Sequence, residues 1–296
     1  MGLERINEDM VQRATYNSRK HGIINNPGIL STGYVDLDYM LGGLRPGEVY
    51  LLAGRPRMGT TSFALNLIRH LSIHGKDGNR GIAYFSLDQG KAQIIKMLLQ
   101  IVAKAEYQDV YINDGDSKKM ETGKLVLSES GLYIEDTPRM SPIEIITSLI
   151  SIPDYANAID LIVIDYLELL DIEDEIELEK TIKCLKAFAE SAGCSVLLLS
   201  RLEETPELRE NHIPIMEDLK WPSLERMVDH VIFLYRDDVY DRDSEMKGIT
   251  EFIIARSKYA SSGVVRLAWL PEYLRFCNLD QADLAENAEK NSDKET

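Results

Sequence analysis

The chain has 296 residues, 44% of them hydrophobic, which is enough to bury a sizeable core. Its 49 acidic and 33 basic residues give a net charge of −16, so its average surface field repels nucleic acid and any DNA contact must be local. The three cysteines have neither metal-ligand nor redox spacing. No apolar run approaches the roughly 18 residues of a membrane span, and the start, MGLERINEDM, lacks the apolar region of a signal peptide. We therefore expect a cytoplasmic protein without membrane contact.

Three regions are distinguishable by composition. Residues 3–20 are polar and free of Gly and Pro, and they lead into the turn-forming run GIINNPG, so residues 1–28 are predicted to be a helix with a linker. Residues 280–296 carry six acidic and two basic side chains with almost no bulky apolar ones, which predicts a disordered acidic tail. Residues 29–279 are expected to form one domain.

Within residues 29–279, short β-rich runs alternate with amphipathic helical ones. The pairs are EVYLLAG with TSFALNLIRHL, GIAYFSL with KAQIIKMLLQIV, and DLIVID with LEKTIKCLKAFAESAG, and SVLLLS follows. This alternation predicts an α/β fold with a mainly parallel sheet flanked by helices. The later runs HVIFLYR, EFIIARSKY, VVRLAWL and LRFCN are strand-like and separated by short turns, which predicts antiparallel hairpins at a sheet edge.

The strongest motif follows the strand at residues 49–53. It consists of Gly54, Arg55, Pro56, Arg57, Met58, Gly59, Thr60, Thr61 and Ser62, and a helical pattern comes next. This is the context of a Walker A phosphate loop, in which backbone N–H groups surround phosphates at a helix N-terminus and Thr61 occupies the position of a Mg²⁺ ligand. Thr60 stands where the motif has lysine. On the motif alone, an ordinary strand-to-helix turn remains an alternative.

The flanking sequence resembles one family. The run STGYVDLDYMLGGLRPGEVYLLAGRPRMGTTSFALN is similar to the start of the motor domain of DnaB-type replicative DNA helicases. The segments FSLD, LYIEDTPRMSPIEI, LIVIDYLELL, LLLSRLEETPELR, FLYRDDVY, KGITEFIIARSK and VRLAWLPEYLRF follow in the family's order, over roughly residues 30–278. The resemblance implies a RecA-like P-loop NTPase that uses ATP and Mg²⁺ in DNA replication. Residues 3–20 resemble at most the family's linker helix, and its N-terminal domain has no counterpart here.

Two carboxylates have implied roles in this site. Asp165 ends the apolar strand at residues 161–164, and by resemblance it is the Walker B aspartate that holds the hydration shell of Mg²⁺. Asp88 closes FSLD, where the family uses glutamate to position the attacking water. Because aspartate is one methylene shorter, the water would be misplaced, and about 1 Å of misplacement can cost two orders of magnitude in rate. A helix-capping role is the alternative for either residue.

The missing lysine removes a cation that would neutralise phosphate charge, a contact worth roughly 1.5 to 3 kcal/mol. Arg201 follows the strand that ends at Ser200, where the family has a glutamine that senses the γ-phosphate, so it could return a cation to the site. A surface ion pair of Arg201 with Glu203 or Glu204 is the alternative. Arg57 could also approach the phosphates, but an exposed loop arginine is the simpler interpretation.

Other positions depart from the family too. Arg256 and Lys258 lie on the run EFIIARSKY, where the family's Lys-x-Arg reaches a neighbouring subunit's nucleotide, so here the two cations are exchanged. The first presumed DNA loop, RLEETPELRENHIP, is acidic. In the second, DLKWPSLERMVD, Lys220 and Trp221 offer a cation and a stacking surface. The alternative for Arg256 and Lys258 is that both are plain solvated charges. The alternative for Trp221 is that it packs a turn. The acidic run from Glu168 to Glu179 is interpreted as a solvated helix start.

We therefore expect a DnaB-like domain that binds ATP or ADP with Mg²⁺ and hydrolyses ATP poorly, because the departures fall at functional positions while the hydrophobic framework is intact. Its expected partners are single-stranded DNA, bound weakly, and either further copies of itself in a homo-oligomer or a replicative helicase. Three alternatives remain: a working helicase motor, a pseudo-ATPase that joins a helicase assembly without turnover, and an adaptor or regulator that has lost nucleotide binding altogether.

Overall fold

The computed structural model describes residues 28–73, 80–106, 110 and 118–279. The helix predicted for residues 3–20 and the tail predicted for residues 280–296 lie outside these residues. In the described part, one nine-stranded sheet has the order β3-β2-β4-β5-β1-β6-β7-β8-β9. Its strands are β1 (Val49–Gly54), β2 (Ile82–Ser86), β3 (Leu132–Glu135), β4 (Leu161–Asp165), β5 (Ser195–Arg201), β6 (His230–Tyr235), β7 (Ile249–Arg256), β8 (Gly263–Leu270) and β9 (Arg275–Cys277). Strands β1 to β6 are parallel to one another, which confirms the predicted mainly parallel sheet.

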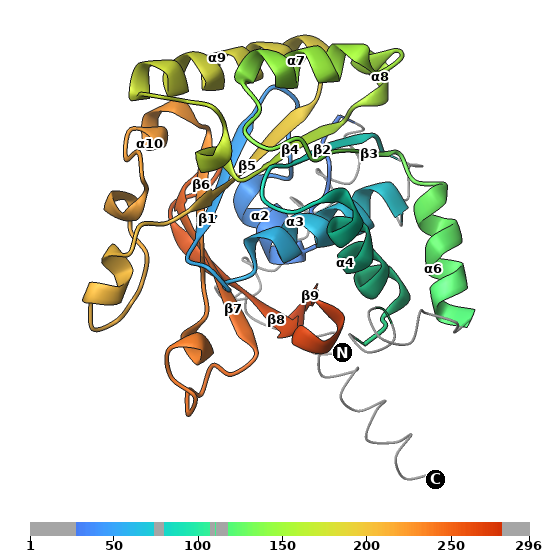
Figure 1. Cartoon of the computed structure of the whole chain (residues 1–296). Coiled ribbons are helices and arrows are strands. Elements are labelled where there is room, and N and C mark those ends of the chain that lie inside the picture. Colours follow the sequence, from blue (N-terminus) through green and yellow to red (C-terminus); the bar gives the residue numbers. More distant parts are fainter. Residues whose placement is uncertain (1–27, 74–79, 107–109, 111–117, 280–296) are drawn as a thin grey trace, which may run out of the picture.

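Helices cover both faces of the sheet (Figure 1). One face carries α2 (Val35–Leu41), α3 (Thr60–Ile68) and α4 (Lys91–Ala103), and the other carries α7 (Pro142–Ser151), α8 (Tyr155–Ala158) and α9 (Glu175–Ala192). The remaining helices are α6 (Lys118–Ser128), α10 (Leu224–Met227), the π-helical turn η1 (Arg69–Ile73) and the 3₁₀ turns η2 (Leu167–Leu169), η3 (Thr205–Leu208), η4 (Met216–Asp218), η5 (Asp237–Val239) and η6 (Pro271–Tyr273).

Strand β1 shows how the two faces are built. Successive side chains of a strand point to opposite faces. Tyr50 and Leu52 accordingly belong to the apolar cluster that includes α3, whereas Val49, Leu51 and Ala53 belong to the cluster that includes α9. All six residues of β1 are buried, so the strand that leads into the phosphate loop is enclosed on both sides.

Helix α9 follows the predicted pattern. Its buried face includes Leu178, Ile182, Leu185 and Ala189, and it ends at Gly193 with the left-handed φ of 69° that glycine adopts without strain. The side chain of Asp174 caps the first turn by accepting a hydrogen bond from the Glu177 amide at 2.8 Å. The interpretation of the whole acidic run as a solvated helix start is wrong at its beginning, because Glu168 lies in η2 and its carboxylate bonds to β5.

The second half of the sheet differs in two details from the predicted hairpins. Strands β7, β8 and β9 are antiparallel neighbours, as predicted. Strand β6, however, is parallel to β1 on one side and antiparallel to β7 on the other, and residues 236–248, which include η5, form a long connection rather than a short turn. Lys258 lies beyond the end of β7 at Arg256, so only Arg256 belongs to the strand.

The strand order brings the candidate residues together. Strand β1 lies between β5 and β6, while β4 lies between β2 and β5. The segments that leave β1, β2, β4 and β5 therefore emerge at the same edge of the sheet, where ligands of open α/β sheets bind. These segments carry the loop at residues 54–62, Asp88, Asp165 and Arg201.

Candidate active site

The loop between β1 and α3 has the backbone of an anion-binding turn. Arg57 and Gly59 have positive φ values of 72° and 102°, and such alternations direct successive backbone N–H groups into a concavity. Gly59 is constrained further, because a Cβ atom there would lie 3.1 Å from Cζ of Phe276. The loop opens directly onto the N-terminus of α3, whose dipole favours negative charge.

The arginines of this loop have different surroundings. The guanidinium of Arg55 is bound to the segment after β5, with Nε donating to Oε1 of Glu207 and Nη1 to the carbonyl of Leu202, both at 2.9 Å. Arg55 thus fixes the loop to the segment that follows β5. Arg57 and Pro56 are exposed, whereas Met58 is buried and anchors the loop in the core. Ser62 is buried in the first turn of α3.

A hydroxyl and carboxylate cluster lies at the mouth of the loop. Asp165 is 1% exposed and accepts hydrogen bonds from Oγ1 of Thr61 at 3.0 Å and from the Tyr84 hydroxyl at 2.5 Å. The Tyr166 hydroxyl lies 2.9 Å from Oγ1 of Thr61 and 3.1 Å from Oγ1 of Thr60. Thr60, which replaces the lysine, is therefore joined to the carboxylate through a chain of hydroxyl groups.

Burial raises the pKa of Asp165 to about 6, although the hydrogen bonds from Tyr84 and Thr61 favour its charged form. The pKa of Tyr84 is raised well above its usual value by burial and by the adjacent carboxylate. The pKa of Tyr166 is raised for the same two reasons. The cluster thus holds a buried carboxylate that lacks a strong counter-charge, and a cation bound there would supply one.

This donor set suits Mg²⁺, a hard cation that takes few protein ligands beside phosphate oxygens and water. The hydroxyl of Thr61 and the carboxylate of Asp165 are the two protein oxygens placed for it, and their contact matches the positions predicted from the sequence. Among the residues that the structure describes, no group of three or more His, Cys, Asp and Glu side chains could hold a metal. An ion at this site would accordingly depend on the nucleotide for its remaining ligands.

Arg201 and Asp88 form an ion pair beside this cluster. Nη2 of Arg201 lies 2.6 Å from Oδ2 of Asp88, and the guanidinium lies over the Tyr166 ring with Cζ 4.3 Å from the ring centroid. The alternative that Arg201 pairs with Glu203 or Glu204 does not match these contacts. Burial disfavours the charge of Arg201, but the hydrogen bond and charge of Asp88 outweigh it and raise the pKa of the guanidinium.

Glu168 is a residue of this site that the sequence reasoning missed. Its carboxylate accepts from Oγ of Ser200 at 2.5 Å and from the amide of Arg201 at 3.0 Å, and burial raises its pKa. It fixes the end of β5 from which Arg201 projects. The signal that could have found it is its position inside the apolar run LELL, where a solvated carboxylate is unexpected.

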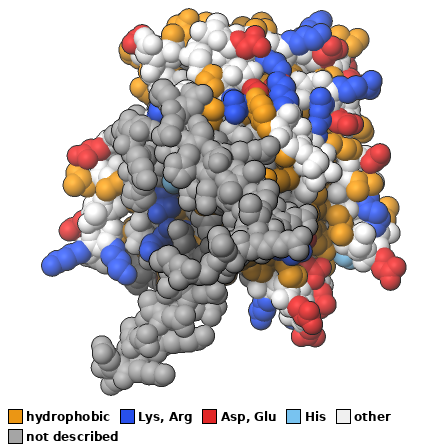
Figure 2. All heavy atoms as spheres, turned by 180° about the vertical axis from the view of Figure 1, so that it is seen from behind, with side chains coloured by type: hydrophobic (Ala, Val, Ile, Leu, Met, Phe, Trp, Pro, Cys, Tyr) orange, Lys and Arg blue, Asp and Glu red, His pale blue; other side chains and the backbone are white. Residues whose placement is uncertain are grey.

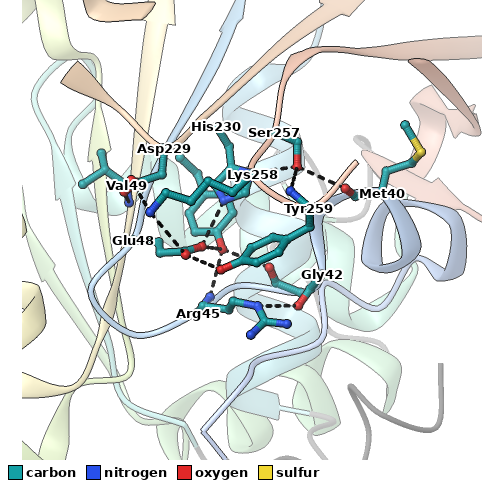
Figure 3. A network of polar contacts seen from close by, with 12 residues as sticks. Met40, Gly42, Arg45, Glu48, Val49, Asp229, His230, Ser257, Lys258 and Tyr259 are labelled. Carbon is teal, nitrogen blue, oxygen red and sulfur yellow. Dashed lines mark hydrogen bonds and ion pairs between the residues drawn. The ribbon is translucent and has the colours of Figure 1, made fainter. Parts of the chain in front are cut away.

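Arg256 and Lys258 lie at the opposite edge of the sheet. Nζ of Lys258 lies 2.6 Å from Oδ1 of Asp229 and 3.6 Å from Oε1 of Glu48, in a network at the amino ends of β1 and β6 (Figure 3). Arg256 is half-buried at the end of β7. Since β7 runs antiparallel to β6, this end is remote from the loop of the same chain. A contact of either cation with a phosphate loop would therefore require a second copy.

The network around Lys258 was not foreseen from the sequence. Glu48 accepts hydrogen bonds from the Tyr50 hydroxyl and from the Tyr259 hydroxyl, and its Oε2 lies 3.0 Å from Nε2 of His230 (Figure 3). Burial alone would raise the pKa of Glu48, but these contacts lower it to about 2. Asp229 binds Nζ of Lys186 at 2.7 Å as well as Lys258. The only sequence signal is an acidic residue just before each of two apolar strands.

The two presumed DNA loops are bound to each other. Arg209 forms an ion pair with the fully buried Asp218, which also accepts from Oγ1 of Thr205 at 2.5 Å. Nζ of Lys220 lies 4.3 Å from the Trp221 ring centroid, and Trp221 packs against the α9 side of the core. The carbonyl of Trp221 accepts from the Leu224 amide at 3.0 Å. These contacts match the alternative of a packed turn, and a role of either side chain in DNA binding stays a prediction.

The surface and the helices add two observations. On the face in Figure 2, outside the grey atoms, acidic and basic side chains are interspersed without an extended basic area. Among the described residues, no helix is both long enough and apolar enough to span a membrane.

These features define a RecA-like P-loop NTPase fold: a mainly parallel sheet, a phosphate loop after β1, and Asp165 at the end of β4, which is separated from β1 in the sheet by β5. Residues 28–278 match the family model of the DnaB-like helicase C terminal domain. The chain therefore belongs to the DnaB-like helicase C-terminal domain family.

Relatives support this assignment. The replicative DNA helicase DnaB of Geobacillus stearothermophilus is 33% identical over 264 residues, which cover 85% of this chain and 57% of the relative. That of Pasteurella multocida (strain Pm70) is 30% identical over 292 residues, which cover 95% of this chain and 62% of the relative. The chain thus spans between 57% and 62% of the length of these two proteins.

Solved structures are similar over most of the chain. A separately solved ATPase domain has a TM-score of 0.78 at 28% identity, with 93% of this chain and all of that chain covered (100%). A DnaB-like replicative helicase, from a structure that describes its interactions with primase, has a TM-score of 0.78 at 29% identity and covers 94% of this chain and 68% of its own. The RadB recombinase, with a TM-score of 0.58 at 16% identity over 85% of this chain and 100% of its own, shares the fold alone.

The raised pKa of Asp165 predicts a stability difference that depends on pH. A carboxyl group whose pKa is raised on folding contributes stability below its unfolded value near 3.8, and that stability is lost as the pH rises through about 6. Asp165→Asn removes the charge, so at pH 8 we expect this variant to be more stable than the native chain by about 2 to 3 kcal/mol, at roughly 1.4 kcal/mol per pKa unit. Urea denaturation at pH 8 and pH 4.5 measures this, and the difference should shrink at the lower pH. An Asp165→Asn variant that is less stable than the native chain at pH 8 would contradict a raised pKa of Asp165.

Two variants distinguish the structural roles of Lys258 and Arg256. Lys258→Ala should lower the free energy of unfolding by about 1 kcal/mol, because the buried Asp229 loses one of its two ammonium partners. Arg256→Ala should change it by less than about 0.5 kcal/mol, since Arg256 is half-buried and forms no ion pair with another described residue. Denaturation of both variants at low protein concentration tests this. Equal losses would show that the network in Figure 3 does not depend on Lys258.

Proposed function

We propose that this chain is the ATPase-type domain of a replicative helicase assembly and that it serves DNA replication. In this proposal residues 29–279 are the domain, residues 1–28 a helix and linker, and residues 280–296 an acidic tail. The domain binds ATP or ADP with Mg²⁺ at residues 54–62 and Asp165, and it hydrolyses ATP poorly. The observation that carries the proposal is the contact between Thr61 and the buried Asp165 at the mouth of a loop shaped for an anion.

The poor hydrolysis follows from what surrounds Thr60. Where the Walker motif has an ammonium, this chain has a hydroxyl that is 4% exposed and bonded to the Tyr166 hydroxyl. A hydroxyl dipole can donate one hydrogen bond to a phosphate but neutralises none of its charge. The lost charge-assisted contact corresponds to roughly 1.5 to 3 kcal/mol, or about one to two decades in rate. Asp88, which is shorter than the family's glutamate, adds a second cause.

The residues have distinct roles in this proposal. Backbone N–H groups of the loop and the N-terminus of α3 hold the phosphates, while Thr61 and Asp165 hold the Mg²⁺ ion, which supplies charge neutralisation when bound. Asp88 orients the attacking water, and Arg201 is the cation beside the phosphates. Arg256, aided by Lys258, addresses the nucleotide of a neighbouring copy, which requires a homo-oligomer or association with a replicative helicase. An adaptor that binds nucleotide without turnover is the second candidate. It is favoured by the same two departures from the family's residues, at Thr60 and Asp88.

The decisive variant for turnover is Thr60→Lys. An ammonium at this position should raise steady-state ATP hydrolysis by about 10- to 100-fold, because it stabilises phosphate charge in the transition state. Thr60→Met, which adds similar length without charge, is the matched control and should give no gain. A phosphate-release assay compares the three proteins and Asp165→Asn, which should be inactive. If the lysine variant is no faster than the methionine variant, the loop does not place nucleotide as proposed.

Binding to single-stranded DNA should be weak and sensitive to salt. The net charge is −16, and the exposed side chains of the first presumed DNA loop include Glu203, Glu204 and Glu207. Fluorescence anisotropy with a labelled oligonucleotide should show binding at about 50 mM salt that is lost by about 200 mM. Trp221→Ala should lower stability without a further loss of DNA affinity, because Trp221 packs a turn. Nanomolar affinity at physiological salt would contradict the proposal, and a loss of about 1 to 3 kcal/mol in DNA binding would instead assign stacking to Trp221.

A further inference from the structure

The ion pair between Arg201 and Asp88 joins two positions that both depart from the family's residues. Arg201 ends β5, and Asp88 follows β2, two residues after the strand ends. The Leu87 amide donates to the carbonyl of Asp165 at 2.8 Å, so the segment that carries Asp88 is fixed beside the buried carboxylate. The pair thus lies over the cluster formed by Thr60, Thr61 and Tyr166.

The two ends of Arg201 are held differently. Its backbone amide is fixed by Glu168, whose carboxylate is also bonded to Ser200. Its guanidinium stacks on Tyr166 and is 40% exposed, while Asp88 is 36% exposed. The base of the side chain is therefore rigid, whereas its charged end is held by a partly solvated contact. Such ion pairs are weak because water screens both charges.

A triphosphate competes well for this guanidinium. Its terminal phosphate carries more charge than a carboxylate and accepts two parallel hydrogen bonds from the planar fork of arginine. The Tyr166 ring beneath Arg201 carries a hydroxyl that reaches Thr60 and Thr61, so the guanidinium is already stacked on a residue that contacts the phosphate loop.

We propose that Arg201 is a phosphate-exchange residue, which leaves Asp88 for the terminal phosphate of a bound nucleoside triphosphate. This inference rests on the proposed function, since it requires nucleotide in the loop at residues 54–62. The exchange has two consequences. It discriminates triphosphate from diphosphate, because a diphosphate lacks the γ-phosphate to which Arg201 moves. It also releases the Asp88 carboxylate only when a triphosphate is bound, so the residue that orients water is freed by the substrate itself.

Calorimetric titration with ADP and with a non-hydrolysable ATP analogue, both with Mg²⁺, tests the exchange through the ratio of the two affinities. Arg201→Gln should weaken analogue binding by about tenfold or more and leave ADP binding unchanged, so the ratio collapses. Arg201→Lys should retain part of the preference for the analogue over ADP. Asp88→Asn should tighten analogue binding several-fold, because the guanidinium no longer has to leave a carboxylate. Arg266→Gln, which removes an ion pair with Glu251 on the antiparallel strands, is the matched control and should leave the ratio unchanged.

The double variant separates exchange from simple repulsion between Asp88 and phosphate. If Asp88 acts through Arg201, the gain from Asp88→Asn disappears in the Arg201→Gln background. An equal gain in both backgrounds overturns the exchange while leaving nucleotide binding intact. An unchanged ratio of the two nucleotide affinities in Arg201→Gln also overturns the exchange. Absence of binding for both nucleotides in every variant overturns the proposed function and the exchange together.

Discussion

The site depends on one buried carboxylate. Asp165 is held at the end of β4 by a strand with apolar neighbours on both faces, so it cannot move to solvent without disrupting the sheet. Its burial raises its pKa to about 6, which means that folding places a charge where the protein does not fully compensate it. The hydroxyls of Tyr84 and Thr61 compensate in part. A divalent cation beside Thr61 would complete the compensation, which agrees with the proposal that this site binds Mg²⁺ with nucleotide.

The groups around this carboxylate are mainly dipolar, and Thr60 stands at the position where the Walker motif has lysine. Thr60, Thr61, Tyr84 and Tyr166 supply hydroxyl groups around it, and the guanidinium of Arg201 lies outside them over the Tyr166 ring. Hydroxyl groups can arrange phosphate oxygens, but they stabilise developing charge less than an ammonium does. This difference is the reason that we propose nucleotide binding with poor turnover.

Much of the fold could be predicted from the sequence, because alternating strand and helix patterns and buried apolar strands determine it directly. The proximity of the loop at residues 54–62 to Asp165 was predicted correctly, since each follows an apolar strand and parallel strands end at one edge. The partner of Arg201 could not be predicted. The sequence offered Glu203 and Glu204 as near neighbours, whereas Asp88 comes from a strand two positions away in the sheet. Glu168 and the network of Glu48 and Lys258 were missed for the same reason, because their partners are distant along the chain.

We propose that the loop holds a magnesium nucleotide without the motif's lysine. An equilibrium calorimetric titration of the native chain with ADP, with and without Mg²⁺, is the sharpest test, because it requires no catalysis and no partner. We expect saturable binding at one site per chain that needs Mg²⁺ and is lost in Thr61→Ala. Binding that is indifferent to both Mg²⁺ and Thr61, or no binding at all, would contradict it.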